Sequence, residues 1–179
     1  MGVERDLSKF KAELTGTHKL KLALWLITQN LFFKSFWVPS RLRIVILKCF
    51  GARIGKGVLI RRGVRVHFPW NLELGDQSWV GEDVWFINHA KIQIASNVCI
   101  SQAAIICSSG HDFLSEALVY KHSPIQIDEG AWICLRATVL AGSKVGRNSV
   151  VSAGEVLAGT LQDNHLYVNG IGKPNEKLS

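Results

Sequence analysis

Residues 94–106 read IASNVCISQAAII, in which the apolar residues Ile94, Ile100 and Ile106 are spaced by six. The same spacing recurs in four further triplets: Ile54, Ile60, Val66; Leu74, Val80, Phe86; Ile127, Ile133, Val139; and Val145, Val151, Leu157. Because 47% of the chain is apolar, fifteen apolar residues at these positions have a chance probability of roughly 10⁻⁵. The spacing therefore indicates an internal repeat, which takes precedence over an element-by-element assignment of strands and helices.

Two other positions of the repeat hold mostly small side chains. The residue after the repeated apolar position is often small, as at a tight corner where a Cβ would crowd the backbone; examples are Gly55, Gly75, Gly81, Ala95, Ser101, Gly146, Ser152 and Ala158. The fifth position is mostly small or Val, which fits a narrow interior. Glu155 departs from this pattern.

Extra residues occur only between the triplets: two after the repeat of Val66, two after that of Phe86 and fifteen after that of Ile106. Three repeats therefore form one coil, and about five stacked coils form a triangular prism. Insertions must leave at a corner, since elsewhere they would interrupt the strand ladder. The sequence thus predicts a parallel β-helix from about residue 54 to residue 158.

Length, charge and cysteine usage suit one domain with an accessory segment. Residues 1–70 hold 14 Lys and Arg against 3 Asp and Glu, and residues 71–179 hold 7 against 11. The basic N-terminal part has two interpretations: it binds an anionic partner, such as a phosphorylated ligand or lipid headgroups, or it is a solvated surface. We expect no nucleic-acid partner. The four cysteines show no C-x-x-C spacing and the N-terminus shows no signal peptide, so we expect a reduced, cytoplasmic protein.

The segment before the repeats differs in character. Residues 22–33 are uncharged and mostly apolar, and residues 41–50 predict a second short helix that Gly51 stops. The first stretch is too short to span a membrane. These helices either cap the open end of the β-helix or lie on an anionic membrane, and a basic, Trp- and Phe-rich segment is able to do both. We therefore expect an N-terminal amphipathic helical segment (1–50), a β-helix domain (51–160) and a C-terminal tail (161–179).

The fifteen-residue insertion, residues 112–126, follows the residues Ser-Ser-Gly-His and places His111 at its root. A histidine held there on a rigid coil is well placed to act as a general base near neutral pH. A surface histidine is the simpler interpretation. Position alone does not choose among His111, His18, His67, His89, His122 and His165.

Several motifs give the chain a resemblance to a known family. The motifs include Phe68-Pro-Trp, Leu74-Gly-Asp, Trp79-Val-Gly-Glu-Asp-Val and Gly110-His-Asp, and they span most of the chain. With them the sequence resembles the hexapeptide-repeat acyltransferases, and within these the colanic-acid and exopolysaccharide O-acetyltransferases, relatives of galactoside and maltose acetyltransferases. The resemblance implies a left-handed parallel β-helix, a homotrimer with active sites between neighbouring prisms, acetyl-CoA as acyl donor and a sugar or glycan acceptor.

The resemblance also implies site residues. His111 matches the base that activates the acceptor hydroxyl, and Asp112 follows it. Asn88 and Trp132 match acceptor-binding positions. The backbone N–H of Leu135 matches an oxyanion donor, and Ala153, Lys144 and Lys173 fall at expected coenzyme contacts, with Arg147 as a further candidate for phosphate. The chain departs from the family pattern at Ala158-Gly159 and Gly172.

Two other classes of function are compatible with a prism of this kind. A γ-type carbonic anhydrase binds zinc through three histidines, two of them closely spaced. His89, His111 and His122 lack such a pair, so we expect no metal. A non-enzymatic scaffold would keep the prism without binding coenzyme A, and the Gly-His-Asp at the loop root argues against it.

Overall fold

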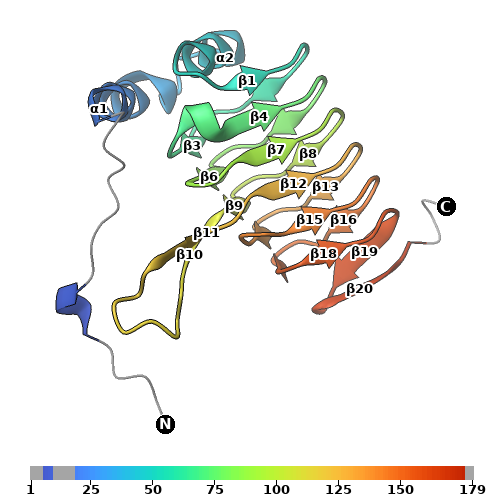
Figure 1. Cartoon of the computed structure of the whole chain (residues 1–179). Helices are drawn as coiled ribbons and strands as arrows, with labels where there is room; N and C mark the ends of the chain where they lie inside the picture. The colour runs from blue at the N-terminus through green and yellow to red at the C-terminus, as the bar shows by residue number, and fades with distance from the viewer. Residues whose placement is uncertain (1–5, 10–18, 176–179) are drawn as a thin grey trace.

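The computed structural model describes residues 6–9 and 19–175, and most of them form a parallel β-helix (Figure 1). Three parallel sheets form the three faces of the prism. The described part holds five complete coils and the start of a sixth, each coil contributing one strand to each face in turn. This is the expected fold class, a β-helix of hexapeptide repeats with an N-terminal helical segment.

The strands of each face are short, because every coil turns a corner after two or three paired residues. The first face holds β1 (Arg53–Ile54), β4 (Leu72–Leu74), β7 (Ile92–Ile94), β12 (Ile125–Ile127), β15 (Lys144–Val145) and β18 (Thr160–Leu161). The second holds β2 (Leu59–Ile60), β5 (Trp79–Val80), β8 (Cys99–Ile100), β13 (Trp132–Ile133), β16 (Val150–Val151), β19 (His165–Val168) and β20 (Ile171–Pro174). The third holds β3 (Arg65–Val66), β6 (Trp85–Ile87), β9 (Ile105–Cys107), β14 (Thr138–Val139) and β17 (Val156–Leu157).

The core contains all fifteen repeated apolar residues, and none of them is more than 7% exposed. They stack in register, so that Ile54 pairs with Leu74 and Leu74 with Ile94 along the first face. The corners are as tight as the small residues predict. A Cβ added to Gly75 would lie 2.5 Å from the backbone of residues 95 and 96.

The structure carries the ladder beyond the expected boundary at residue 160. Leu161 is buried, and β19 pairs with β16 before turning into the antiparallel strand β20. Glu155, which departs from the repeat pattern, has a role here. Its carboxylate accepts hydrogen bonds from the backbone N–H groups of Asn169 and Gly170 at 2.8 and 3.1 Å, and so holds the turn between β19 and β20.

The helices α1 (Lys19–Thr28) and α2 (Ser40–Cys49) lie across the open end of the first coil, with the π-helical turn η3 (Gln29–Phe33) after α1 (Figure 1). We call residues 19–49 the helical cap. Gly51 ends the second helix with a φ of +99°. The apolar side chains Trp25, Phe33 and Leu47 are fully buried against the coil.

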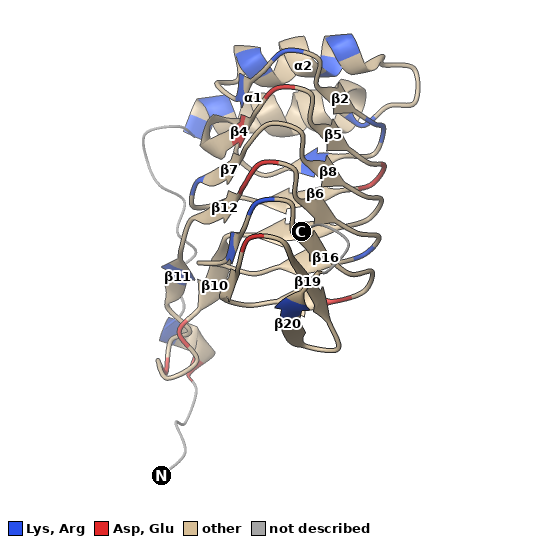
Figure 2. Ribbon diagram, turned by 90° about the vertical axis from the view of Figure 1, so that its right-hand side faces the viewer, with Lys and Arg blue, Asp and Glu red and all other residues tan. Residues whose placement is uncertain are grey.

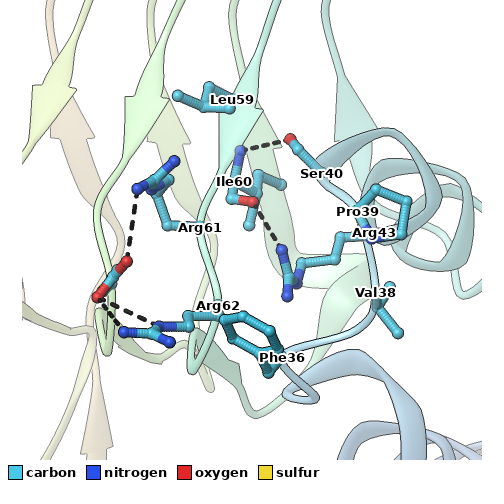
Figure 3. Close-up of a pocket in the computed structure, with 10 residues that line it drawn as sticks. Phe36, Val38, Pro39, Ser40, Arg43, Leu59, Ile60, Arg61 and Arg62 are labelled. Carbon is cyan, nitrogen blue, oxygen red and sulfur yellow. Dashed lines mark hydrogen bonds and ion pairs between the residues drawn. The ribbon is translucent and has the colours of Figure 1, made fainter.

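Polar groups at the edge of the first coil are bonded to the cap. Trp25 Nε1 donates to the Val66 carbonyl at 2.8 Å, and Gln29 Oε1 accepts from the Val66 N–H at 2.7 Å. Ser40 Oγ accepts from the Ile60 N–H at 2.9 Å, and the Arg43 guanidinium donates to the Ile60 carbonyl at 3.3 Å (Figure 3). The cap thus pairs an edge that would otherwise be open to another strand.

A cleft of about 430 Å³ lies between the cap and the corner that joins the second and third faces (Figure 3). Its cations already have partners: Arg61 and Arg62 pair with Glu82 at 3.5 and 3.4 Å, and Arg43 donates to three backbone carbonyls. We therefore interpret this cleft as a junction of the cap and the prism, and the candidate functional site lies elsewhere.

Candidate functional site

The long insertion leaves the prism at the corner between the third and first faces, which we call the loop corner. It begins as a hairpin of β10 (Ser109–His111) and β11 (Tyr120–His122), with His111 opposite Tyr120. Residues 112–119 form its tip, which projects from the prism (Figure 1). The short helix η1 (Leu7–Lys9) lies beside this tip, where Lys9 pairs with Glu116 at 3.1 Å. His111 therefore lies on a hydrogen-bonded strand next to the rigid coil.

The geometry of His111 defines which ring nitrogen is able to accept a proton. Its Nδ1 lies 2.7 Å from the carbonyl oxygen of Leu118, and its ring centroid lies 4.7 Å from that of Tyr120. Because a carbonyl only accepts hydrogen bonds, Nδ1 carries the proton, and the lone pair of the neutral ring is on Nε2. The Leu118 carbonyl thus orients the imidazole as a general base requires.

The carboxylate of Asp112 makes a hydrogen bond within the hairpin. Its Oδ1 accepts from the backbone N–H of Leu114 at 2.9 Å, and its own N–H donates to the carbonyl of Val119 at 2.8 Å. The carboxylate thus shapes the turn at the tip of the hairpin. The structure places it next to His111 in the chain and gives the orienting contact to Leu118.

Asn88 is bonded within the prism at the loop corner. Its side chain is fully buried, its Oδ1 accepts from the Phe68 N–H at 3.0 Å, and its Nδ2 donates to the Phe68 carbonyl at 2.6 Å. Both polar atoms therefore join two successive coils at the loop corner.

A cluster of rings that the sequence analysis did not predict surrounds the base of the hairpin. His89 stacks on His122 with 4.8 Å between ring centroids and lies 5.5 Å from His67 and 4.9 Å from Phe68. Tyr120 lies 5.2 Å from His122 and extends the cluster to His111. The sequence does hold one sign of this cluster: all these residues lie in or beside insertions that leave the prism at the loop corner.

Crowding lowers the pKa of two histidines in this cluster. Burial, followed by the charges of His122, His67 and His111, lowers the pKa of His89 from 6.5 to about 4. Burial and then the charge of Arg65 lower the pKa of His67. The buried Nδ1 of His89 has no hydrogen-bond partner among the described residues. His89 is therefore neutral at physiological pH.

We expect the folded protein to lose stability as the pH falls below about 6.5, the pKa of an unperturbed histidine. Between that value and about 4 the unfolded chain binds a proton at His89 that the folded chain does not, so the free energy of unfolding falls with pH. Allowing for partial exposure, the loss is about 1 kcal/mol, or about 2–4 °C in melting temperature. Melting curves near neutral pH and near pH 4.5 measure it. His89→Gln should reduce this difference, and His165→Gln, at the far end of the prism, should leave it unchanged.

The residues expected at the coenzyme lie on other parts of the prism. Leu135 and Ala153 lie on the corner between the second and third faces, where the Gly154 N–H donates to the Leu135 carbonyl at 2.9 Å. Trp132 is half exposed on β13 of the second face, and its Nε1 donates to Ser101 Oγ at 2.9 Å. Lys144 lies on the first face, 3.6 Å from Asp128, and Lys173 lies on β20. Leu135 and Ala153 therefore lie at a different corner of the protomer from His111.

The ring cluster raises the question of metal binding, because four histidines gather there. Within residues 6–9 and 19–175, no group of three or more His, Cys, Asp or Glu side chains is arranged to hold a metal ion. Stacked imidazoles such as His89 and His122 present their faces to each other, whereas a metal needs convergent nitrogen lone pairs.

Comparison with known proteins gives the family of the chain. No family model matches it. WcaF of Escherichia coli (strain K12), a candidate colanic acid biosynthesis acetyltransferase, is 36% identical over 154 residues, which make up 83% of this chain and 84% of that protein. The chain belongs to the hexapeptide-repeat acyltransferases, in the branch that contains WcaF.

Solved structures agree in fold. A maltose O-acetyltransferase from Clostridium difficile 630 matches with a TM-score of 0.77 and 22% identity, over 88% of both chains. A hexapeptide-repeat acetyltransferase from Vibrio cholerae O1 biovar eltor, solved with acetyl coenzyme A, matches with a TM-score of 0.82 and 17% identity, over 97% of this chain and 96% of that one. The expected fold, family and enzyme class are thus confirmed.

Proposed function

We propose that this protein transfers an acetyl group from acetyl-CoA to a hydroxyl group of a sugar acceptor, in the synthesis of a cell-surface glycan. The observation that carries the proposal is the contact between His111 Nδ1 and the Leu118 carbonyl at 2.7 Å, which puts the lone pair of the neutral ring on Nε2. Similarity to WcaF supports the glycan acceptor. The neighbour solved with acetyl coenzyme A supports the acyl donor.

The reaction we propose is a direct transfer in which His111 first acts as a base. Nε2 takes the proton of the acceptor hydroxyl as its oxygen attacks the thioester carbon, and a tetrahedral oxyanion forms. A backbone N–H donor, for which Leu135 is our candidate, stabilises the oxyanion. The C–S bond then breaks, and the departing thiolate takes the proton from the imidazolium. No covalent enzyme intermediate is required.

The placement of the residues favours a homotrimer. His111 lies at the loop corner of the prism, whereas Leu135 and Ala153 lie at a different corner. A closed ring of three protomers can bring the loop corner of one copy against the second or third face of the next, and so assemble three complete sites. Trp79 and Trp132, both exposed on the second face, would then be covered by a neighbour. We propose that Trp132, Ala153, Lys144 and Lys173 act at such a shared site.

The test of the proposed function is acetyl transfer by the purified protein. With acetyl-CoA and a panel of nucleotide-linked, lipid-linked and polymeric glycans, mass spectrometry should show the gain of one acetyl group on at least one acceptor. Light scattering of the same sample should show a trimer. A scaffold would show no binding of coenzyme A in calorimetry, and that result would overturn the proposal. Protein that binds coenzyme A but acetylates only amines would change the acceptor from a hydroxyl to an amino group.

A further inference from the structure

The outer side of α1 carries an apolar stripe that nothing in the described structure covers. Leu20, Leu24, Ile27 and Leu31 recur at the spacing of one helix face and are 51–76% exposed. The opposite side of the same helix is fixed to the prism through Trp25 and Gln29, whose side chains bond to the backbone of Val66. The helix is therefore unable to roll and bury its outer stripe without breaking the contacts that cap the first coil.

Further apolar side chains are exposed on the rest of the cap. Phe36 and Trp37 lie in the link between η3 and α2, where Phe36 borders the cleft and Trp37 is 86% exposed. Leu42 and Val45 are exposed on α2. We call these four residues and the α1 stripe the cap face. Exposed apolar side chains in such number on one segment are typical of an interaction site in a soluble protein.

Charge on the cap restricts the partner. Residues 19–50 contain six Lys and Arg residues and no Asp or Glu. Lys19, Arg41 and Lys48 are exposed, and Figure 2 shows Lys and Arg positions along α1 and α2, at one end of the prism. The cap face of a second copy would bring the same positive charge and would be repelled. A nucleic acid would neutralise the charge and leave the apolar stripe in water.

We propose that the cap face binds in the plane of an anionic lipid bilayer, with the β-helix pointing away from it. Apolar side chains enter the boundary of headgroups and acyl chains, and the flanking Lys and Arg contact the anionic headgroups. Among the described residues, none of the helices has the length and apolar character to cross a membrane. In the proposed bound state the cap face lies in the plane of the bilayer and holds the loop corner at a fixed orientation to the membrane.

Sedimentation of the full-length chain with vesicles tests this surface. Binding should be strong to phosphatidylcholine vesicles with about one-third phosphatidylglycerol and weak to phosphatidylcholine alone, and salt should weaken it. Replacing Lys19, Arg41 and Lys48 by Gln removes about one headgroup contact per residue. The partition coefficient of the protein onto vesicles should therefore fall roughly hundredfold. Leu24→Gln with Leu31→Gln should reduce it at least tenfold.

A matched control keeps the test specific. Ile171→Gln with Val156→Gln alters side chains that are 65% and 53% exposed at the far end of the prism, and should leave vesicle binding unchanged. Melting curves check that each variant folds. Equal, weak sedimentation of wild type with both vesicle types would overturn the proposal, as would stripe variants that change molar mass in light scattering but not lipid binding. The assay needs no acetyl transfer, so its result is independent of the proposed activity.

Discussion

His111→Ala is expected to slow acetyl transfer by about 10²–10⁴-fold while leaving binding of coenzyme A and the oligomeric state unchanged. The imidazole is the proton acceptor in the proposed reaction, and its loss leaves water to take the proton of the hydroxyl. Because the ring is exposed on the hairpin, outside the buried core of the prism, its removal should not unfold the prism. Steady-state kinetics, calorimetry and light scattering measure the three properties.

His165→Ala is a matched control for this substitution. Its Nδ1 also lies against a backbone carbonyl, that of Asp163 at 2.8 Å, but at the opposite end of the prism. This variant should keep the wild-type rate. Activity retained in His111→Ala would move the base to another residue, and His89, linked to His111 through Tyr120, would be the first to test.

Trp25→Ala is expected to lower the free energy of unfolding by about 3–5 kcal/mol, the range for a fully buried Trp. The indole ring packs against Phe33 and Phe50, with 5.3 and 5.2 Å between ring centroids, and its Nε1 donates to the Val66 carbonyl. The substitution leaves a cavity between the cap and the first coil and an unpaired carbonyl at the edge of the ladder. In a chain of this size we expect the melting temperature to fall by roughly 10 °C.

Two variants separate packing from other effects. Trp25→Phe keeps an aromatic ring and loses the Nε1 hydrogen bond, so its melting temperature should lie between those of wild type and Trp25→Ala. Trp37→Ala removes the same side chain from a position that is 86% exposed, and should leave the melting temperature unchanged. If Trp25→Ala had the same melting temperature as the wild type, the cap would not belong to the same cooperative unit as the β-helix.

The fold could be predicted because one geometric requirement acts at every repeat. A coil with short faces needs an inward apolar residue at each face and a small residue where the backbone turns. Residues such as Ile94 and Ile100 therefore predict a face, and residues such as Gly75 predict a corner, in every repeat. The C-terminal boundary could not be predicted in this way. There β19 and β20 continue the ladder with a different spacing, and Glu155 holds their turn through hydrogen bonds that a hydrophobic pattern does not report.

The candidate site was predicted only in part. The root of the insertion pointed to His111, since an insertion has to leave at a corner. The contact that orients the ring comes from a backbone carbonyl, which has no sequence signature. The ring cluster was missed because His67, His89 and His122 are far apart in the chain and meet only when successive coils stack.

Because every coil has the same rise, distances along the axis of the prism are set by the number of coils. Each coil adds the spacing of neighbouring strands, about 4.8 Å, and the hairpin with His111 follows β9 of the third coil, whereas the cap packs on the first. The root of that hairpin therefore lies roughly 10 Å further along the axis than the first coil. A coil added or removed between the cap and the hairpin would change this separation by one strand spacing, about 4.8 Å. The cross-section of the prism would stay the same.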